Sequence, residues 1–423
     1  MTRSGGVWPR QWHRVVGRTV AVGGSLVLAA CGSASAPVPA AGGLADVPGP
    51  TLATSLDAPG GTGWAVVQMG GRASTADSFW ELFARPAGGS SWKLVTPAGV
   101  ATNGGLVIAP AGTGRLVAGI RPSQQLRFSP LATSADAGAQ WSDDAMLSPG
   151  LANVPDALAA SADGRLLALT DAGAVQIGAD FGATWTRLAT LATLAAFPAA
   201  RACGLTALTA VAWTTTGSPL VGGECRTPGT AGLFTQVAGR WQLIGPALTG
   251  TGPGPATVLG LATTGGRTTA LLALTAGTAR TVVAAWSGDS GLHWTLSPPL
   301  RTARSLSSVS FRADGTAAVV LTPARRGAAG EAAAGEAAAG AAAASAEATI
   351  GWQASRWVTL PPLTMTQSGQ TGTPKIATLA TSADGVPQVM AVSGGTLTVW
   401  QLGPDQWTLQ QTVHVSIPYG SSG

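Results

Sequence analysis

Short apolar runs alternate with polar turns along most of the chain. Six glycine-containing turns each lie between two such runs; they are residues 111–114, 161–164, 215–217, 264–266, 312–315 and 382–385. Apolar runs joined by Asp-Gly or Gly-Gly are typical of β-hairpins. Val and Thr are frequent, whereas long helix-forming side chains are scarce, with only 2 Lys in the chain. The pattern therefore predicts an all-β protein and argues against a helical bundle or a coiled coil.

A tryptophan follows the hairpin at regular spacing, at intervals of 44 to 63 residues: Trp92, Trp141, Trp185, Trp241, Trp294, Trp357 and Trp407. Each interval has room for four short strands, and a four-stranded sheet buries both faces only when neighbours stack beside it. Seven separate small domains would each lack a core. We therefore predict a seven-bladed β-propeller of four-stranded antiparallel blades over residues 50–415. Six or eight blades, and either terminus as the closing strand, remain open.

Around three of these tryptophans the sequence has the pattern Ser-x-Asp-x-Gly-x-x-Trp. Two copies are complete and a third has Gly178 in place of the serine; their residues are Ser134, Asp136, Gly138 and Trp141, then Asp180, Gly182 and Trp185, then Ser287, Asp289, Gly291 and Trp294. The pattern resembles the Asp-box of sialidase-like, sortilin-like and photosystem II assembly factor-like propellers. Its chemistry suits a turn between a third and a fourth strand, where Asp accepts backbone N–H groups and Gly supplies the required conformation. We interpret these residues as structural.

The first thirty residues resemble a lipoprotein signal peptide. Four Arg and no acid precede the apolar run 19–28, and Leu28-Ala29-Ala30-Cys31 follows. The resemblance implies cleavage after residue 30, a lipid on Cys31, a flexible tether over residues 31–49, and a lipid-anchored protein on the extracytoplasmic side of the cell membrane. The alternative is an ordinary signal peptide that happens to contain a cysteine. Residues 416–423 form a short tail.

The other two cysteines, Cys203 and Cys225, flank the turn-like stretch 214–217. Export would place them in an oxidising compartment, where a pair of thiols forms a disulfide more readily than it stays reduced. A metal site is disfavoured, because the mature chain offers only His293 and His414 as further soft ligands. We predict a Cys203–Cys225 disulfide, no metal site and no cofactor.

The charge of the chain gives no support for a nucleic-acid partner. The net charge is +5, but four of the positive charges lie before residue 30, where the signal peptide would be removed. A low-complexity stretch of Ala, Gly and Glu, residues 327–348, interrupts the sixth repeat and is interpreted as a loop insertion.

The residues needed for sialidase chemistry are scarce. The resemblance implies a Tyr nucleophile activated by Glu, an arginine triad and an Asp acid, yet the only tyrosine is Tyr419, in the tail, and only Glu81 and Glu224 lie outside the insertion. No catalytic residue is predicted, and a non-catalytic binding or scaffold protein is favoured. The alternative is a carbohydrate-active enzyme, a glycoside hydrolase with a carboxylate pair that the sequence does not reveal.

Four arginines gather in one sector if the strands follow propeller order: Arg301, Arg304, Arg325 and Arg326. Arginine forks pair well with carboxylates and phosphates, so this sector is the candidate site for a protein or an anionic ligand. The alternative is four solvated loop residues. The expected partners are the membrane, through the N-terminal lipid, and a protein or glycan ligand.

Overall fold

The computed structural model describes residues 52–58, 61–70, 78–97, 105–121, 131–142, 155–170, 173–277, 279–322, 348–353, 356–363, 375–404 and 406–416. The chain divides into two units, Met1–Asp46 and Val47–Gly423, and every described residue belongs to the second. The predicted signal peptide and tether therefore lie outside the described residues. So do the insertion, apart from Ala348, and the tail beyond residue 416.

Antiparallel pairing joins consecutive strands into seven runs within the described residues. The first four runs are β1 (Ala53–Asp57), β2 (Gly63–Gly70), β3 (Ser78–Arg85) and β4 (Lys93–Leu94); β5 (Gly105–Pro110), β6 (Leu116–Arg121) and β7 (Leu131–Ser134); β8 (Pro155–Ala160), β9 (Leu166–Thr170), β10 (Ala174–Ala179) and β11 (Thr184–Thr190); and β12 (Leu205–Trp213), β13 (Pro219–Cys225), β14 (Gly232–Val237) and β15 (Arg240–Leu243).

The remaining three runs follow in chain order. They are β16 (Ala256–Thr264), β17 (Arg267–Ala276), β18 (Ala279–Ser287), β19 (Thr295–Leu296) and β20 (Leu300–Thr302); β21 (Ser305–Phe311), β22 (Ala317–Thr322), β23 (Ala348–Gln353) and β24 (Arg356–Thr359); and β25 (Lys375–Thr381), β26 (Pro387–Ser393), β27 (Thr396–Leu402) and β28 (Trp407–His414).

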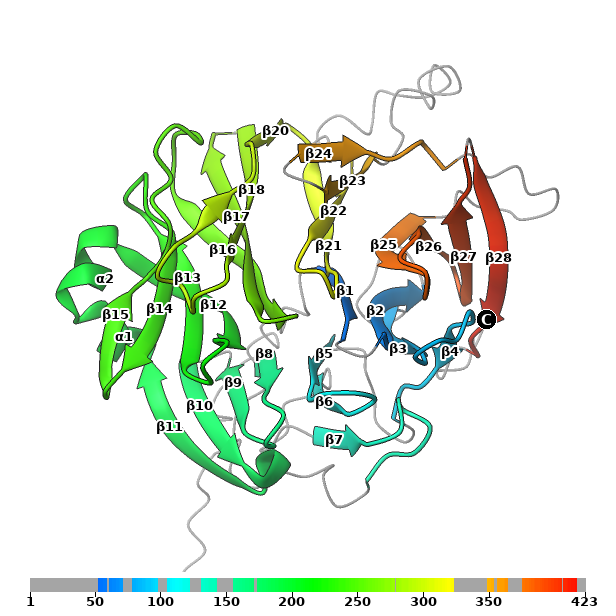
Figure 1. The fold of residues 1–423 in the computed structure, drawn as a ribbon, viewed down its shortest axis with the longest axis horizontal. Coiled ribbons are helices and arrows are strands. Elements are labelled where there is room, and N and C mark those ends of the chain that lie inside the picture. The colour runs from blue at the N-terminus through cyan, green and yellow to red at the C-terminus, as the bar shows by residue number, and fades with distance from the viewer. Residues whose placement is uncertain are drawn as a thin grey trace, which may run out of the picture. The chain divides into compact units, whose positions relative to one another are not determined.

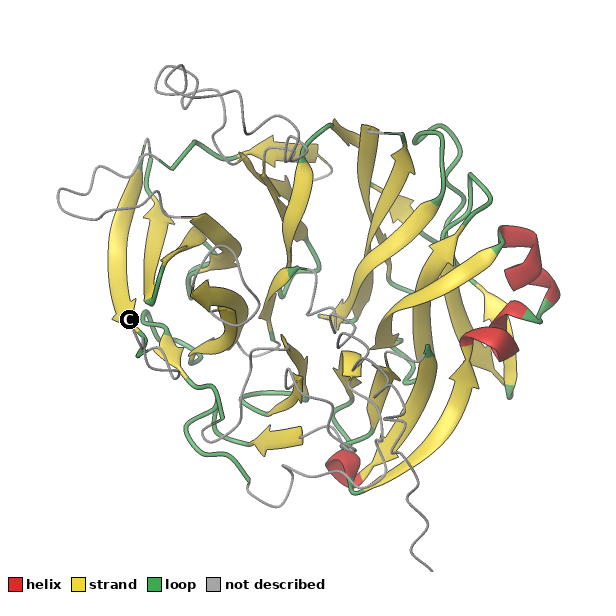
Figure 2. Ribbon diagram, turned by 180° about the vertical axis from the view of Figure 1, so that it is seen from behind, coloured by secondary structure: helices red, strands yellow, loops and turns green. Residues whose placement is uncertain are grey.

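The structure is all-β, as the hairpin pattern predicts, and Figure 2 shows strands throughout the described chain with helices confined to its edge. The helical elements are short: η2 (Asp180–Gly182), α1 (Leu191–Ala195) and α2 (Pro198–Cys203). Two runs depart from four strands. The second has three strands and a single bridge between Thr133 and Ser142, and in the fifth both β19 and β20 pair with β18.

Two first strands that are far apart in the chain lie beside each other and run in the same direction. β1 pairs in parallel with β21, with Ala53 opposite Ser308 and Leu56 opposite Phe311, and Figure 1 shows the blue β1 against the yellow-green β21. We call the end where each first strand turns into the second the turn end. The opposite end, where the chain passes from one run to the next, is the link end.

The first and last runs meet through side chains and belong to different sheets. The backbone N–H of Trp92 donates to Gln411 Oε1 at 2.7 Å, and Gln411 Nε2 donates back to the Trp92 carbonyl at 2.6 Å. The Trp92 indole N–H donates to Gln388 Oε1 at 2.9 Å. Apolar side chains of β2, β3, β26 and β27 form one buried cluster around this contact. Among the described residues, the first run therefore takes no strand from the C-terminal end, and the last run takes none from the N-terminal end.

The recurrent tryptophans connect neighbouring runs. Four of them donate the indole N–H to a backbone carbonyl that follows the fourth strand of the preceding run: Trp141 to Val95 at 2.8 Å, Trp294 to Ile244 at 2.6 Å, Trp357 to Pro298 at 2.7 Å and Trp407 to Pro361 at 2.9 Å. The sequence shows only that these tryptophans recur at regular spacing. In the structure the same side chain also joins its run to the one before it.

Candidate functional site

A cavity of about 800 Å³ lies among the first strands of six runs, β1, β5, β8, β12, β16 and β21. Its wall consists mainly of Ala, Val, Leu and Thr side chains from these strands, and turns of the turn end border it at residues 110–112, 161–163, 214–217 and 264–266. β25 does not line the cavity, because β1 and β21 pair directly with each other and separate that strand from it. The cavity is therefore bounded by regular strands over most of its surface.

Threonine hydroxyls in this wall hold neighbouring first strands together. Thr209 Oγ1 donates to the Val258 carbonyl at 2.7 Å, Thr263 Oγ1 donates to the Trp213 carbonyl at 2.6 Å, and Thr264 Oγ1 donates to the Arg312 carbonyl at 3.2 Å. Each bond joins strands of adjacent runs. Because these hydroxyl protons are committed to backbone carbonyls, the wall presents mostly carbon to the cavity.

One corner of the cavity carries an ion pair. Arg165 Nε lies 2.9 Å from Asp163 Oδ2, and the Arg165 guanidinium stacks 4.4 Å above the centre of the Trp213 ring. The hydroxyl of Ser161 donates to Asp163, and this bond, followed by Arg165, lowers the pKa of Asp163 below its ordinary value. The corner therefore places a cation, a carboxylate and an indole ring at the turn end of the cavity.

Asp57 also lines the cavity, and it belongs to a buried group where the first and last runs meet. Its carboxylate accepts the Thr381 hydroxyl and lies 3.8 Å from Arg85 Nη2, while Arg85 Nε donates to the Thr381 carbonyl at 3.1 Å. The side chain of Asp57 is 12% exposed and that of Arg85 is 2% exposed. Burial raises the pKa of Asp57 and lowers the pKa of Arg85, because it penalises the charged form of each.

A set of arginines at the turn end was not singled out from the sequence. Arg165 donates to the Gly217 carbonyl at 3.4 Å, Arg267 to the Asp314 carbonyl at 3.5 Å, and Arg312 to the Gly385 carbonyl. Each arginine reaches the first turn of the following run. A repeated Gly-Arg pair at the start of the second strand, in 114–115, 164–165 and 266–267, is the signal that could have identified part of this set.

The residues of the first complete Ser-x-Asp motif form the turn between β7 and the bridge at Ser142. Ser134 Oγ donates to Asp136 Oδ1 at 2.9 Å and accepts the N–H of Gly138 at 2.9 Å, while Asp136 Oδ1 accepts the N–H of Gln140 at 2.9 Å. Gly138 has φ +83°, and a Cβ there would lie 2.6 Å from Val95 Cβ in the preceding run. Glycine is needed here both for the backbone conformation and for the close approach.

The second complete copy repeats this geometry between β18 and β19. Ser287 Oγ donates to Asp289 Oδ1 at 2.7 Å and accepts the N–H of Gly291 at 2.8 Å. Asp289 Oδ1 accepts the N–H of His293, and Oδ2 lies 2.6 Å from the His293 ring; these contacts hold the pKa of Asp289 far below its ordinary value. The remaining motif residue, Trp294, is the ring that reaches Ile244.

The third copy has a different turn. Asp180 and Gly182 lie in η2, and both Asp180 and Phe181 have positive φ, 49° and 53°. Gly178 supplies no hydroxyl, and a Cβ at that position would approach the Trp185 ring to 3.1 Å. The Trp185 indole N–H is buried without a hydrogen-bond partner among the described residues. In this copy, where Gly178 stands in place of the serine, the turn forms without the Ser–Asp hydrogen bond.

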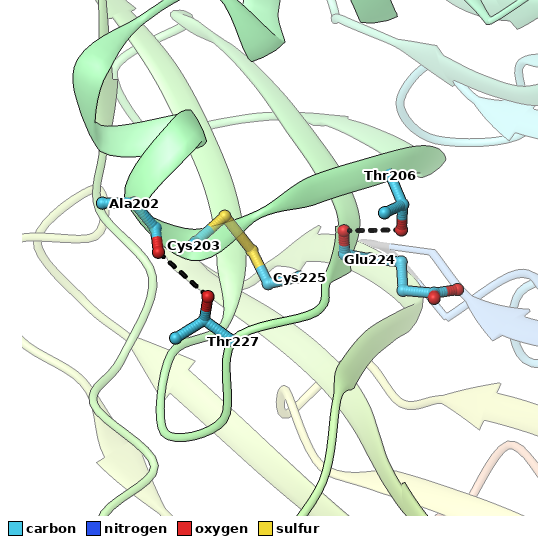
Figure 3. The surroundings of a disulfide bond; sticks show 6 residues. All are labelled: Ala202, Cys203, Thr206, Glu224, Cys225 and Thr227. Carbon is cyan, nitrogen blue, oxygen red and sulfur yellow. Dashed lines mark hydrogen bonds between the residues drawn. A yellow bond between two sulfur atoms is a disulfide. The ribbon is translucent and has the colours of Figure 1, made fainter.

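The predicted disulfide is present, and Figure 3 shows Cys203 joined to Cys225. The hairpin of β12 and β13 turns at residues 214–218, as the sequence suggests, and Leu205 lies opposite Cys225. Cys203 itself ends α2 just before β12 begins. The bond therefore attaches the helical link between two runs to the end of a second strand, in addition to closing the hairpin.

Two of the four predicted arginines lie among the described residues. Arg301 lies in β20, opposite Thr281 of β18, and is exposed, while Arg304 follows in the link to β21 and is half-buried. Arg280 of β18 lies opposite Thr302 in the same strand pair, which the sequence analysis missed because 21 residues separate it from Arg301. Arg325, Arg326 and Cys31 lie outside the described residues.

Within the described ranges, no group of three or more His, Cys, Asp and Glu side chains is placed to hold a metal ion. No helix in the described part of the chain is long and apolar enough to cross a membrane.

No protein-family model matches this chain, and no curated protein is similar to it at a significant level. Among solved structures, the chain resembles β-propeller proteins. One is described as YCF48 bound to D1 peptide, with 13% identity, 85% of this chain and 95% of that chain covered, and a TM-score of 0.42. A prolyl endopeptidase has 12% identity, 89% and 52% coverage and a TM-score of 0.45.

A third similar structure is that of the RRP9 WD40 repeats, with 10% identity, 63% of this chain and 71% of that chain covered, and a TM-score of 0.38.

Proposed function

We propose that the chain is a membrane-anchored binding protein on the extracytoplasmic side of the cell membrane, which recognises a protein or an anionic ligand and catalyses no reaction. The observation that carries the proposal is the cavity of about 800 Å³ enclosed by the first strands. Ligand pockets in proteins range from roughly 300 to 1,000 Å³ and have mostly apolar walls with a few polar groups. The cavity described here has this character.

The proposal takes the seven runs as the seven blades of a propeller and the turns at Asp136, Asp180 and Asp289 as Asp-boxes. Three observations support it. The first strands β12 and β16 run in parallel, as the bonds of Thr209 and Thr263 require, and the first strands β1 and β21 do the same. Indole N–H groups and turn-end arginines repeat the same contact from run to run. In a propeller such contacts hold successive blades in place.

We propose that the protein is not a catalyst because the polar side chains of the cavity wall are already hydrogen-bonded. Its threonine hydroxyls donate to neighbouring carbonyls, and the Asp163 carboxylate is engaged by Ser161 and Arg165. Groups held in this way stabilise the strand arrangement. A catalytic nucleophile must instead be able to lose its proton at the substrate, and a general base must be able to accept one there.

A glycosidase is the second candidate, favoured by one observation. Asp57 and Asp163 line the same cavity, and their pKa values are shifted in opposite directions, upward by burial at Asp57 and downward by hydrogen bonding at Asp163. Pairs of carboxyl groups with divergent pKa values serve as acid and base in glycoside hydrolysis.

Binding and catalysis are separated by one experiment on the full-length protein. Chemical cross-linking in native membranes, followed by co-purification, should recover a partner in fixed stoichiometry. The purified protein should release no product from a panel of glycans. Glycan turnover that is lost in both Asp57→Asn and Asp163→Asn would instead support the glycosidase.

The anchor is tested separately by feeding cells an alkyne-labelled fatty acid. The wild-type chain should take up the label and sediment with membranes, and Cys31→Ser should lose both properties. The matched control is the Cys203→Ser, Cys225→Ser double variant, which keeps Cys31 and should be labelled like the wild type. Labelling that persists in Cys31→Ser would contradict the anchor.

A further inference from the structure

We infer that the link end faces the membrane and contacts anionic lipid headgroups through Arg280, Arg301 and Arg304. The inference rests on the proposed lipid anchor, because only an anchored chain keeps this end close to a lipid surface. It replaces the unspecified anion of the proposed function with a partner of defined chemistry.

The three arginines lie on adjoining backbone segments. β18 and β20 are antiparallel, with Arg280 opposite Thr302 and Arg301 opposite Thr281, and Arg304 follows two residues after β20 ends. Arg301 is exposed, and Arg280 and Arg304 are half-buried. Long arginine side chains with partly buried stems can extend their guanidinium groups toward a surface.

Charged residues are distributed unequally between the two ends. Among the described residues, the basic side chains at the link end are Arg201, Arg226, Arg280, Arg301, Arg304 and Lys375, whereas the acidic ones are Asp156 and Glu224. The turn end carries seven of the described aspartates, namely Asp57, Asp136, Asp163, Asp180, Asp289, Asp314 and Asp384, together with eight basic residues, namely Arg85, Lys93, Arg115, Arg165, Arg240, Arg267, Arg312 and Arg356. The described link end therefore has an excess of positive charge, whereas positive and negative charges nearly balance at the turn end.

The chain from the proposed anchor arrives at the same end. β1 begins at Ala53, which lies opposite Ser308, only four residues after Arg304. The 21 residues between Cys31 and β1 span at most about 75 Å when fully extended. A lipid on Cys31 would therefore hold the β1–β21 edge, and the arginines beside it, near the bilayer.

This placement favours a lipid partner over an acidic protein. Lys or Arg near an anionic membrane surface strengthens binding by about fivefold per residue. The attraction is screened over a Debye length of about 8 Å at physiological salt. The anchor supplies the proximity that such a short-range attraction requires, whereas an acidic protein partner would gain nothing from the position of the tether.

The test measures energy transfer from a dye on the protein to labelled lipid in vesicles that hold the anchored chain. One dye is attached at the link end through Ser305→Cys and another at the turn end through Ala383→Cys; both positions are exposed. Transfer from position 305 should exceed transfer from position 383. It should increase further when phosphatidylglycerol replaces part of the phosphatidylcholine. This increase should disappear in 0.5 M salt, where the Debye length is about 4 Å, roughly half its value at physiological salt.

The Arg280→Ala, Arg301→Ala, Arg304→Ala variant should lose the phosphatidylglycerol-dependent increase. Its matched control, Arg115→Ala, Arg240→Ala, Arg356→Ala, removes the same charge from exposed turn-end positions and should retain the increase. Equal transfer from both positions, or an increase that survives in the first variant, would overturn the inference. If the first variant lost a co-purified acidic protein while its energy transfer to lipid stayed unchanged, the arginines would be assigned to that protein instead.

A second form of anchoring keeps this result independent of lipidation. A hexahistidine segment placed at residue 31 attaches the chain to nickel-chelating lipid through the same 21 residues. If the native chain carries no lipid, the proposed anchor fails, while the face that turns toward the bilayer can still be read from the hexahistidine form. The same two outcomes then decide the role of the arginines.

Discussion

At the scale of single residues, Arg85 connects the start of the chain to its end. It is 2% exposed, lies 3.8 Å from Asp57, and donates to the Thr381 carbonyl of the last run. Replacing Arg85 with Leu should destabilise the protein by about 3 kcal/mol, because it leaves a nearly buried carboxylate without its cation. Urea denaturation measures the loss. The exposed Arg240→Leu is the control, and an equal effect of both variants would contradict the role of Arg85.

Asp136 gives a pH dependence of known sign. The N–H of Gln140 and the hydroxyl of Ser134 lower the pKa of Asp136 below its ordinary value of 3.8. The ionised form therefore stabilises the folded state at neutral pH, and this contribution is lost as pH falls through the lowered pKa. The thermal midpoint of Asp136→Asn should fall less between pH 7 and pH 3 than that of the wild type. Asp384→Asn, in an exposed turn, should follow the wild type; an equal fall in all three would refute the assignment.

Asp57 contributes a pH dependence of stability with the opposite sign. Its pKa is raised in the folded state, mainly by burial, so the folded protein binds this proton more tightly than the unfolded chain. The associated stability is fully present below 3.8, the ordinary pKa, and is lost as pH rises through the folded pKa. The two aspartates therefore partly cancel in the pH profile of the wild type, and single variants are needed to see either.

At the scale of elements, indole bonds hold four of the described runs to their predecessors. Trp141→Phe and Trp294→Phe keep an aromatic ring but remove the indole donors to Val95 and Ile244, and each should cost about 1 kcal/mol. Trp185→Phe is the matched control, because its N–H is buried without a partner among the described residues. Chemical denaturation should show Trp185→Phe to be at least as stable as the wild type. A loss there equal to the other two would show that ring size, and not the hydrogen bond, matters.

The disulfide acts on the link between two runs. Cys203 ends α2 and Cys225 ends β13, with a sequence separation of 22. Replacing both with Ala should lower the free energy of unfolding by about 3 kcal/mol, since the bond closes a loop of that size in the unfolded chain. A reducing agent should shift the wild type to the same midpoint and leave the double variant unchanged. A shift of the double variant on reduction would show that another reducible group contributes.

Local motifs could be predicted from sequence because their causes are local. The hairpin turns, the Ser134–Asp136 and Ser287–Asp289 pairs and the proximity of the two cysteines all follow from residues a few positions apart, or from one hairpin. The helix that ends at Cys203 was not predicted, because its six residues are too few to show an amphipathic period. Arg280 was missed for a related reason, since only strand pairing brings it beside Arg301.

At the scale of the whole molecule, the four arginines named from the sequence can be tested together. If the arginines bind a protein and not lipid, replacing Arg301, Arg304, Arg325 and Arg326 with Ala should reduce recovery of the cross-linked partner by at least tenfold, because the replacement removes four guanidinium groups from the sector predicted from the sequence. Quantitative mass spectrometry of the co-purified proteins measures the change. The control replaces Lys93, Arg115, Arg240 and Arg356 at the turn end, all of them exposed. Unchanged recovery in the first variant would exclude protein docking by these arginines and leave lipid as their partner.

The cavity illustrates what sequence could not provide at this scale. A repeat length near fifty residues predicts that sheets stack side by side, but the direct pairing of β1 with β21 excludes β25 from the cavity wall. That pairing joins residues about 250 positions apart, and no local pattern signals it. The Asp57–Arg85–Thr381 group arises from the same convergence and was likewise invisible in the sequence.

The pairing of β1 with β21 also has a consequence for how the chain is made. The partner of β1 emerges from the ribosome only after some 250 further residues, and the contacts of Trp92 with Gln388 and Gln411 come later still. Contacts between such distant residues slow folding. The first run therefore waits in an incomplete state while the others form, so chains shortened before residue 305 should be the ones most readily degraded.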